Sequence, residues 1–243
     1  MYLLRSNLDD PRRRLLVKLL AMGGFSAAPM AQALADLLGE KPGKLPPDRS
    51  IYRLSGQVTV SGQPATIKTK INPTDTIETG KNSEIVFVNV DTAYILRESS
   101  RMNLARQTEG NVLTNALRLL TGKVLAVFPP SKPQRLYSAT ATIGIRGTGV
   151  YMESDPEQTY FCTCYGVTDI NANNDKQSKK TVKSSHHDEP LYILAKAAEG
   201  KSIRGAPFIN HTDQELMLIE TLVGRQPPFV FPSEDYGGPR KDY

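Results

Sequence analysis

The chain of 243 residues has no tryptophan, two cysteines and three histidines, and 39% of its residues are hydrophobic. So few cysteines exclude a disulfide-dense scaffold. No stretch reaches the eighteen or so apolar residues of a strong membrane span, which excludes a polytopic membrane protein. Charged residues make up 23% of the chain, and together with this apolar content they exclude a wholly disordered polypeptide.

Residues 11–35 have the order of an export signal. Three arginines precede a moderately apolar run, and small-residue sites of the A-x-A type follow it. Arg13 and Arg14 lead into Leu-Leu-Val-Lys, which resembles the twin-arginine pattern R-R-x-F-L-K. We therefore predict an export-signal helix over residues 1–35 and a periplasmic or secreted protein. The membrane would be contacted only through an uncleaved signal anchor; the alternative is an amphipathic helix packed on the domain.

The positive charge of the chain belongs mostly to this predicted signal. The whole chain carries 30 basic and 25 acidic residues, and five of the basic and two of the acidic ones lie in residues 1–35. The remainder therefore has a formal charge of +2, which gives no electrostatic reason to expect nucleic-acid binding.

The residues after the signal show the patterns of an all-β domain. Residues 36–50 form a Gly/Pro-punctuated linker, and residues 51–170 hold short β-branched and aromatic runs between turn residues. We expect short stacked strands, arranged as a small β-solenoid or roll or as a meander. The run Leu113–Leu120 is too short for its periodicity to separate a strand from a helical turn.

The last part of the chain is predicted to add a strand and one helix. Residues 171–190 are polar and read as a long surface loop or hairpin tip, and residues 191–231 supply a strand and a C-terminal helix that packs on the β domain. The helix begins at the capping box Thr212-Asp213-Gln214-Glu215. Residues 232–243 are predicted to be a disordered tail.

Two sequence blocks carry a resemblance to a known family. The first runs from Gly56 to Phe87 with the pattern G-x-V-x-V, a glycine turn, D-x-I-x-T-G and an apolar strand; the second is Ala141–Val150, which contains R-G-T-G-V. Together they resemble the FecR-type periplasmic domain over about residues 51–170. The resemblance implies an exported, stand-alone FecR-like β domain.

This resemblance leads to the first functional hypothesis, a non-catalytic module for protein binding, envelope signalling or assembly, whose partner is another envelope protein. Members of the family often regulate a cytoplasmic sigma factor. About ten residues precede the arginines, too few for an independent helical segment, so sigma-factor binding is not expected here.

A second hypothesis comes from the position of the reactive side chains. Every cysteine and histidine lies at or after residue 162: Cys162, Cys164, His186, His187 and His211. Two cysteines two residues apart on a strand face the same side, and thiolate and imidazole are ligands that Zn or Cu favours. A sensor or structural metal site is therefore the alternative function. Under the first hypothesis these residues are packing and loop residues, and the protein needs no cofactor.

Other candidate chemistry is weaker. The glycine-rich run Gly144–Gly149 lacks the G-x-G-x-x-G spacing and continues as a strand, so we interpret it as a bend and not as a phosphate cradle. Ser184 to Asp188 are contiguous, whereas a catalytic triad is assembled by the fold from separate segments. We therefore do not expect an enzyme.

Overall fold

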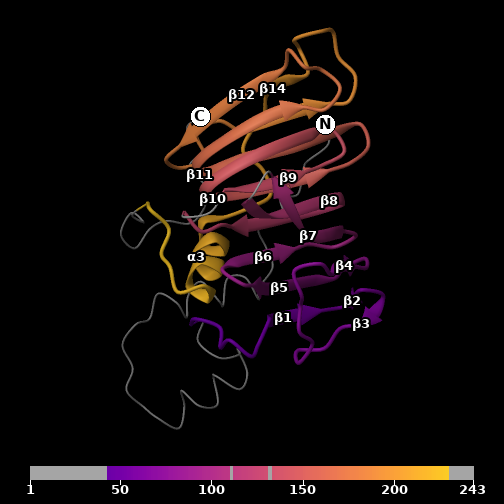
Figure 1. Cartoon of the computed structure of the whole chain (residues 1–243), viewed down its shortest axis with the longest axis vertical. Coiled ribbons are helices and arrows are strands. Elements are labelled where there is room, and N and C mark those ends of the chain that lie inside the picture. Colours follow the sequence, from indigo (N-terminus) through magenta and orange to yellow (C-terminus); the bar gives the residue numbers. More distant parts are fainter. Residues whose placement is uncertain (1–42, 110–111, 131–132, 230–243) are drawn as a thin grey trace, which may run out of the picture. The chain divides into compact units, whose positions relative to one another are not determined.

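The structure is a computed structural model that describes residues 43–109, 112–130 and 133–229, and the side chains of residues 106–115 are not part of that description. The predicted signal with Arg13 and Arg14, the first part of the linker and the predicted tail lie outside the described residues. The described chain is all-β with one C-terminal helix, as the sequence predicts (Figure 1). Within it, no helix has the length and apolar character needed to cross a membrane.

Fourteen strands and one helix follow each other along the described chain. They are β1 (Ile51–Ser55), β2 (Val58–Val60), β3 (Gln63–Pro64), β4 (Thr76–Thr79), β5 (Glu84–Asn89), β6 (Thr92–Leu96), β7 (Arg101–Glu109), β8 (Val112–Val127), β9 (Gln134–Tyr137), β10 (Ala141–Ser154), β11 (Gln158–Ala172), β12 (Lys179–Ser184), β13 (Leu191–Leu194), β14 (Ile203–Gly205) and α3 (Asp213–Leu222).

The strands are joined mainly as a meander. The main path of hydrogen-bonded neighbours is β14-β13-β11-β10-β9-β8-β7-β4-β2-β3. Off this path, β5 pairs with β1 and β6, β6 also pairs with β8, and β12 pairs with β11. Among the described strands every pairing is antiparallel except that of β8 with β9. In a β-solenoid the strands of neighbouring coils pair in parallel. Of the arrangements expected from the sequence, the antiparallel meander therefore describes these pairings.

Three long strands change neighbours halfway along their length. The first half of β8 pairs with β7 and β9, and its second half pairs with β6 and β10. Likewise, β10 passes from β9 to β8, and β11 passes from β13 to β12. The sheet is thereby divided into two parts that share the backbones of β8, β10 and β11.

Glycines occupy the place where the long strands change neighbours. The pairing of β10 with β11 shifts register between Arg146 and Val150, and Gly166 of β11 has φ +94°. A Cβ at Gly166 would lie 2.4 Å from Thr148 Cγ2 and 2.6 Å from the carbonyl oxygen of Gly147. The backbones approach too closely for any side chain, which explains why glycine stands there.

Alternating side chains of the strands fill two separate hydrophobic clusters. The larger cluster collects residues from both parts of the sheet, among them Ile77, Phe87, Leu119, Ile143 and Phe161. The alternate residues of β5, β6, β8, β10 and β11 form the second cluster together with three residues of α3. One face of these strands is therefore covered by the helix, which lies next to β6 and β8 (Figure 1).

Three segments differ from, or sharpen, the sequence prediction. Leu113–Leu120 is part of the 16-residue strand β8, because its neighbours β7 and β9 supply partners on both sides. The polar stretch 171–190 is not all loop: Lys179–Ser184 forms β12, which pairs with β11 as the outer strand of a hairpin. Its exposed residues Lys179, Thr181 and Lys183 alternate with the more buried positions between them, and lysines of this kind protect an edge strand. A further short strand, β14, follows the predicted last strand.

Candidate metal centre

Cys162 and Cys164 lie on the helix-covered face of β11. Both thiols are free, and both residues have 0% exposure. Their two-residue spacing places both side chains on one face of the strand, as the sequence predicts. The two sulfurs therefore project into the second hydrophobic cluster, between β11 and the segment that carries α3.

His187 reaches these cysteines from the connection between β12 and β13. Its backbone N–H donates to the carbonyl oxygen of Cys164 at 2.9 Å, and its φ of +56° is one that few side chains adopt. The turn before it is fixed by Asp188, whose carboxylate accepts hydrogen bonds from both the N–H and the hydroxyl of Ser185. The local backbone thus holds the imidazole against β11.

His211 enters the same cluster from the start of the helix. It immediately precedes Thr212, the N-cap of α3, where the predicted capping box is present with Glu215 at its third position. The imidazole stacks on Tyr151 with ring centroids 4.4 Å apart and an interplanar angle of 17°. His211 is 2% exposed, so it is a buried histidine with a fixed ring plane.

The four side chains place one ligand atom each within a small volume. The sulfurs of Cys162 and Cys164 and one nitrogen each of His187 and His211 all lie within 4.8 Å of one another. The two nitrogens, His187 Nδ1 and His211 Nε2, are 3.2 Å apart, and Cys162 Sγ lies 3.5 Å from His187 Nδ1. The fold therefore brings together four of the five residues that the sequence singles out.

The outer hydrogen bonds decide which nitrogens carry hydrogen. His211 Nδ1 lies 2.7 Å from the carbonyl oxygen of Ile209, and His187 Nε2 lies 2.9 Å from a carboxylate oxygen of Asp213. Both oxygens can only accept, so these two nitrogens are the donors. In the neutral rings, the remaining nitrogens then direct lone pairs at each other across 3.2 Å. A cation between them, either a proton or a metal ion, removes this conflict.

His186, the fifth predicted residue, lies beside the cluster and not within it. Its Nε2 is 2.9 and 3.0 Å from the two carboxylate oxygens of Asp213. Asp213 is 3% exposed and is the first residue of α3. Its carboxylate therefore joins both His186 and His187 to the start of the helix. Asp213 is not among the site residues that the sequence predicts; the available signal is an acidic residue directly after an N-cap threonine that follows a histidine.

The ionisation of these groups reflects their burial and their contacts. Burial alone would raise the pKa of the Cys162 thiol, but hydrogen bonds with Cys164 and the two histidines hold that pKa well below its usual value. Burial raises the pKa of Cys164, and the charge on Cys162 raises it further. Burial lowers the pKa of His187, yet its bonds to Asp213 and Cys162 prevail and raise it to about 9.

Aromatic rings close the cluster off from water. Phe208 lies 4.6 Å from the ring of His187 and 4.4 Å from that of His211, centroid to centroid. Phe229 lies 4.5 Å from the ring of His186. In these apolar surroundings, interactions between charged ligands and a cation are stronger than in water.

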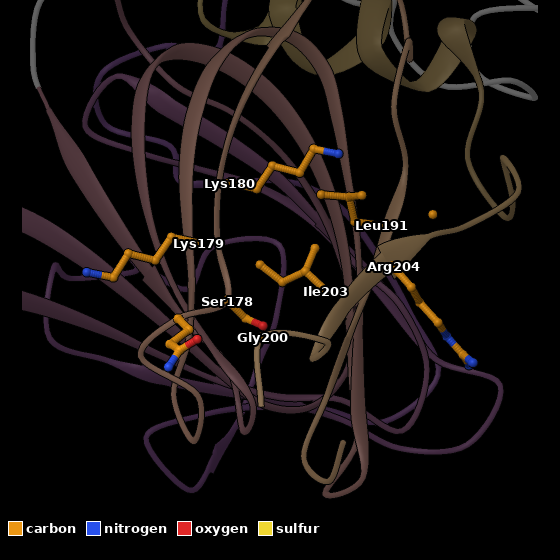
Figure 2. A pocket seen from close by; sticks show the side chains of 9 residues that line it. Ser178, Lys179, Lys180, Leu191, Gly200, Ile203 and Arg204 are labelled. Carbon is orange, nitrogen blue, oxygen red and sulfur yellow. The ribbon is translucent and has the colours of Figure 1, made fainter. Parts of the chain in front are cut away.

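A separate cavity of about 190 Å³ lies between β12, β13 and β14 (Figure 2). Three basic residues line it, but Figure 2 shows Lys179, Lys180 and Arg204 directed away from one another. Lys180 pairs with Glu189, and the guanidinium of Arg204 lies over the ring of Tyr192. The charged groups of these three side chains therefore do not converge on one point of the cavity.

The glycine-rich run is part of a strand. Gly144–Gly149 lies inside β10, at its register shift with β11, and the chain continues as strand to Ser154. The Arg146 side chain is 74% exposed and approaches Asp169 at 3.7 Å. This agrees with the predicted bend, and Arg146 lies at the surface of the domain.

Comparisons with known proteins give only distant similarities. No protein-family model matches the chain, and no curated protein matches it. Two solved structures from Parabacteroides distasonis, both provisionally described as anti-sigma factors, are similar to it. One is 11% identical with a TM-score of 0.43, over 60% of this chain and 74% of that one. The other is 13% identical with a TM-score of 0.44, over 68% and 83%.

Proposed function

We propose that the chain is a non-catalytic β domain that binds one Zn²⁺ ion through Cys162, Cys164, His187 and His211. The observation that carries this proposal is the convergence of one ligand atom from each of the four side chains within 4.8 Å of one another, with His187 Nδ1 3.2 Å from His211 Nε2. A tetrahedral zinc ion with its usual bond lengths separates two nitrogens by about 3.3 Å and a nitrogen from a sulfur by about 3.5 Å. The separations of 3.2 and 3.5 Å in this site match these two values, and all four donor atoms lie within 4.8 Å of one another.

The donor set favours zinc among the transition metals. Two sulfurs and two imidazole nitrogens in a compact group are typical of tetrahedral zinc sites. The contact between His187 Nε2 and Asp213 repeats the carboxylate–histidine–zinc arrangement, in which the carboxylate fixes the tautomer and orients the ring.

A structural or sensing role fits this site better than catalysis. Four protein ligands complete the tetrahedron, whereas catalytic zinc keeps one position open for water or substrate. All four ligands are at most 2% exposed, so a substrate has no route to the ion in the closed domain. Catalysis is not part of the proposal.

The wider role that we propose is binding to another protein of the bacterial envelope after export. The leader pattern at Arg13 and Arg14 and the resemblance to FecR-type domains support this role. The metal centre would fix the C-terminal part of the binding domain.

The proposal is tested by measuring the metal content of the purified full-length chain. We expect about one zinc per chain by mass spectrometry. Replacing Cys162 and Cys164 together by serine should reduce this to background, and His186→Ala is the matched control because His186 lies outside the four ligands. Reconstitution with Co²⁺ should give thiolate-to-metal charge-transfer absorption in the wild-type protein and in the control. A folded wild-type protein that takes up neither ion would overturn the proposal, and stoichiometric copper in place of zinc would overturn the choice of metal.

A further inference from the structure

Helix α3 covers an apolar face of the sheet. Leu216, Ile219 and Leu222 of the helix are at most 1% exposed and belong to one cluster with the side chains of the strands beneath. The strand residues are Val86, Ala93, Ile95, Leu125 and Val127. If the helix moved away, these residues would meet water.

The N-terminal end of α3 is joined directly to the proposed ligands. His211 is the residue before the N-cap, so its imidazole and the first turn of the helix share one short piece of backbone. Asp213, the first helical residue, accepts hydrogen bonds from His187 and His186. Each histidine ligand is therefore tied to the start of the helix, one through the backbone and the other through a carboxylate.

Loss of the metal would disturb this end of the helix. Without metal, the 3.2 Å contact between His187 Nδ1 and His211 Nε2 can be held by one hydrogen shared between the two rings. A proton can bridge two of the donors, but it cannot hold four donors from three segments of the chain. If His211 moves, the N-cap moves with it; if His187 moves, the buried Asp213 loses a partner.

The other end of the helix is held independently of the metal. Glu220 accepts hydrogen bonds from Tyr165 and from Arg225, and Arg225 also donates to the carbonyl oxygens of Asp91 and Val127. Near the N-terminal end, Glu215 pairs with Arg97 at 2.9 Å, with both side chains partly exposed. The metal-dependent contacts are thus concentrated before and within the first turn.

We propose that the metal centre is a latch that controls the docking of α3. With the metal bound, the first turn of the helix is fixed to β11; without it, the helix opens from its N-terminal end and uncovers the apolar face of β5, β6 and β8. This inference rests on the proposed metal site and adds a regulatory consequence to it.

The test is hydrogen–deuterium exchange on the full-length chain, loaded with zinc or treated with a chelator. We expect amides of Leu216–Leu222 to exchange at least about tenfold faster without metal, since opening of a local segment governs their exchange. A peptide from β2 to β4 is the internal reference and should exchange at an unchanged rate. Replacement of Cys162 and Cys164 by serine should reproduce the effect without chelator, and Asp169→Asn, a change on β11 outside the cluster, should respond to zinc like the wild type.

The outcomes separate the two proposals. A chain that binds no metal overturns the metal site, and the latch with it. A chain that binds one zinc but shows the same α3 exchange with and without it overturns the latch alone. Faster exchange in the β2–β4 reference as well would also overturn the latch, because the metal would then stabilise the whole domain and not one segment.

Discussion

At the scale of single residues, the candidate centre depends on a carboxylate that is not itself one of the proposed ligands. Asp213 is nearly fully buried and accepts hydrogen bonds from His186 and His187. Its negative charge raises the basicity of the His187 ring and fixes Nδ1 as the nitrogen that faces the cysteines. Position and charge therefore both matter at residue 213.

Asp213→Asn should weaken zinc binding about tenfold or more, because outer carboxylates of histidine ligands typically contribute 10–100-fold to metal affinity. The measurement is competition with a chelator of known affinity. Asp169→Asn, a substitution on β11 outside the cluster, is the control and should keep the wild-type affinity. Equal affinities for the two variants would contradict the role of Asp213.

Another buried carboxylate supports the turn between β11 and β12. Asp175 accepts hydrogen bonds from the hydroxyls of Ser178 and Ser202 and from the N–H of Gly200. The bond from Ser178 is the main cause that lowers the pKa of Asp175 from 3.8 to about 2. The carboxylate therefore joins two loops that are distant in sequence.

The pH dependence of stability should reveal Asp175. A carboxyl with a lowered pKa in the folded state stabilises fully above its ordinary pKa, and this stabilisation is lost as the pH falls from about 4 towards 2. We expect Asp175→Asn to be less stable than the wild type at pH 5, with the difference shrinking towards pH 2. Denaturant unfolding with chelator present, so that metal release does not contribute, measures this. A difference that does not vary with pH would contradict the prediction.

At the scale of the elements, the shared strands depend on glycine at their crossing. Gly166 has a positive φ, and a Cβ there would clash with Thr148 and with the backbone of Gly147. The strain cannot be relieved by rotating a flexible side chain, since one of the close atoms is a backbone oxygen. The bend between the two parts of the sheet therefore requires glycine at position 166.

Gly166→Ala should lower the free energy of unfolding by about 2–4 kcal/mol, the range typical of a strained φ combined with a steric clash. Gly205→Ala is the matched control, because apart from its chain neighbours no atom of the described residues lies within 4 Å of its added Cβ, and it should change stability by less than about 0.5 kcal/mol. Denaturant unfolding of both variants gives the comparison. Equal stability of the two would contradict the role of the crossing.

Much of this element structure follows from local sequence signals. Alternation and turn residues predict the strands from Ile51 onward, and the capping box at Thr212 predicts the helix start. The division of β8, β10 and β11 between two sets of neighbours has no such signal, because it depends on contacts between residues far apart in sequence. The same holds for β12, whose polar composition resembles a loop until β11 supplies its partner.

The candidate metal centre, too, can be predicted only in part from the sequence. The residue types and the two-residue cysteine spacing predict which side chains could meet. They do not distinguish His187, which joins the cysteines, from the adjacent His186, which faces Asp213 and Phe229. That choice depends on the positive φ at His187 and on the Asp188 turn. The role of Asp213 likewise depends on the packing of the helix against the sheet, which brings its carboxylate to His187.

At the scale of the whole molecule, export is the prediction that decides where the domain works. Replacing both Arg13 and Arg14 by lysine should keep the protein inside the cell, because the twin-arginine pattern requires both residues. Arg12→Lys is the matched control and should leave export unchanged. Fractionation of cells that express each form measures the distribution. Export of the double variant at the wild-type level would contradict a twin-arginine signal.

The three backbones that belong to both parts of the sheet also determine how the domain can come apart. Each part has β8, β10 and β11 in its interior, so neither retains a full set of strand partners if the other is lost. Cooperative unfolding follows from this connectivity, and the β domain should melt in one transition. For the same reason, neither part of the sheet is a module that could be deleted, duplicated or transplanted alone. The sheet can be kept or lost only as a whole.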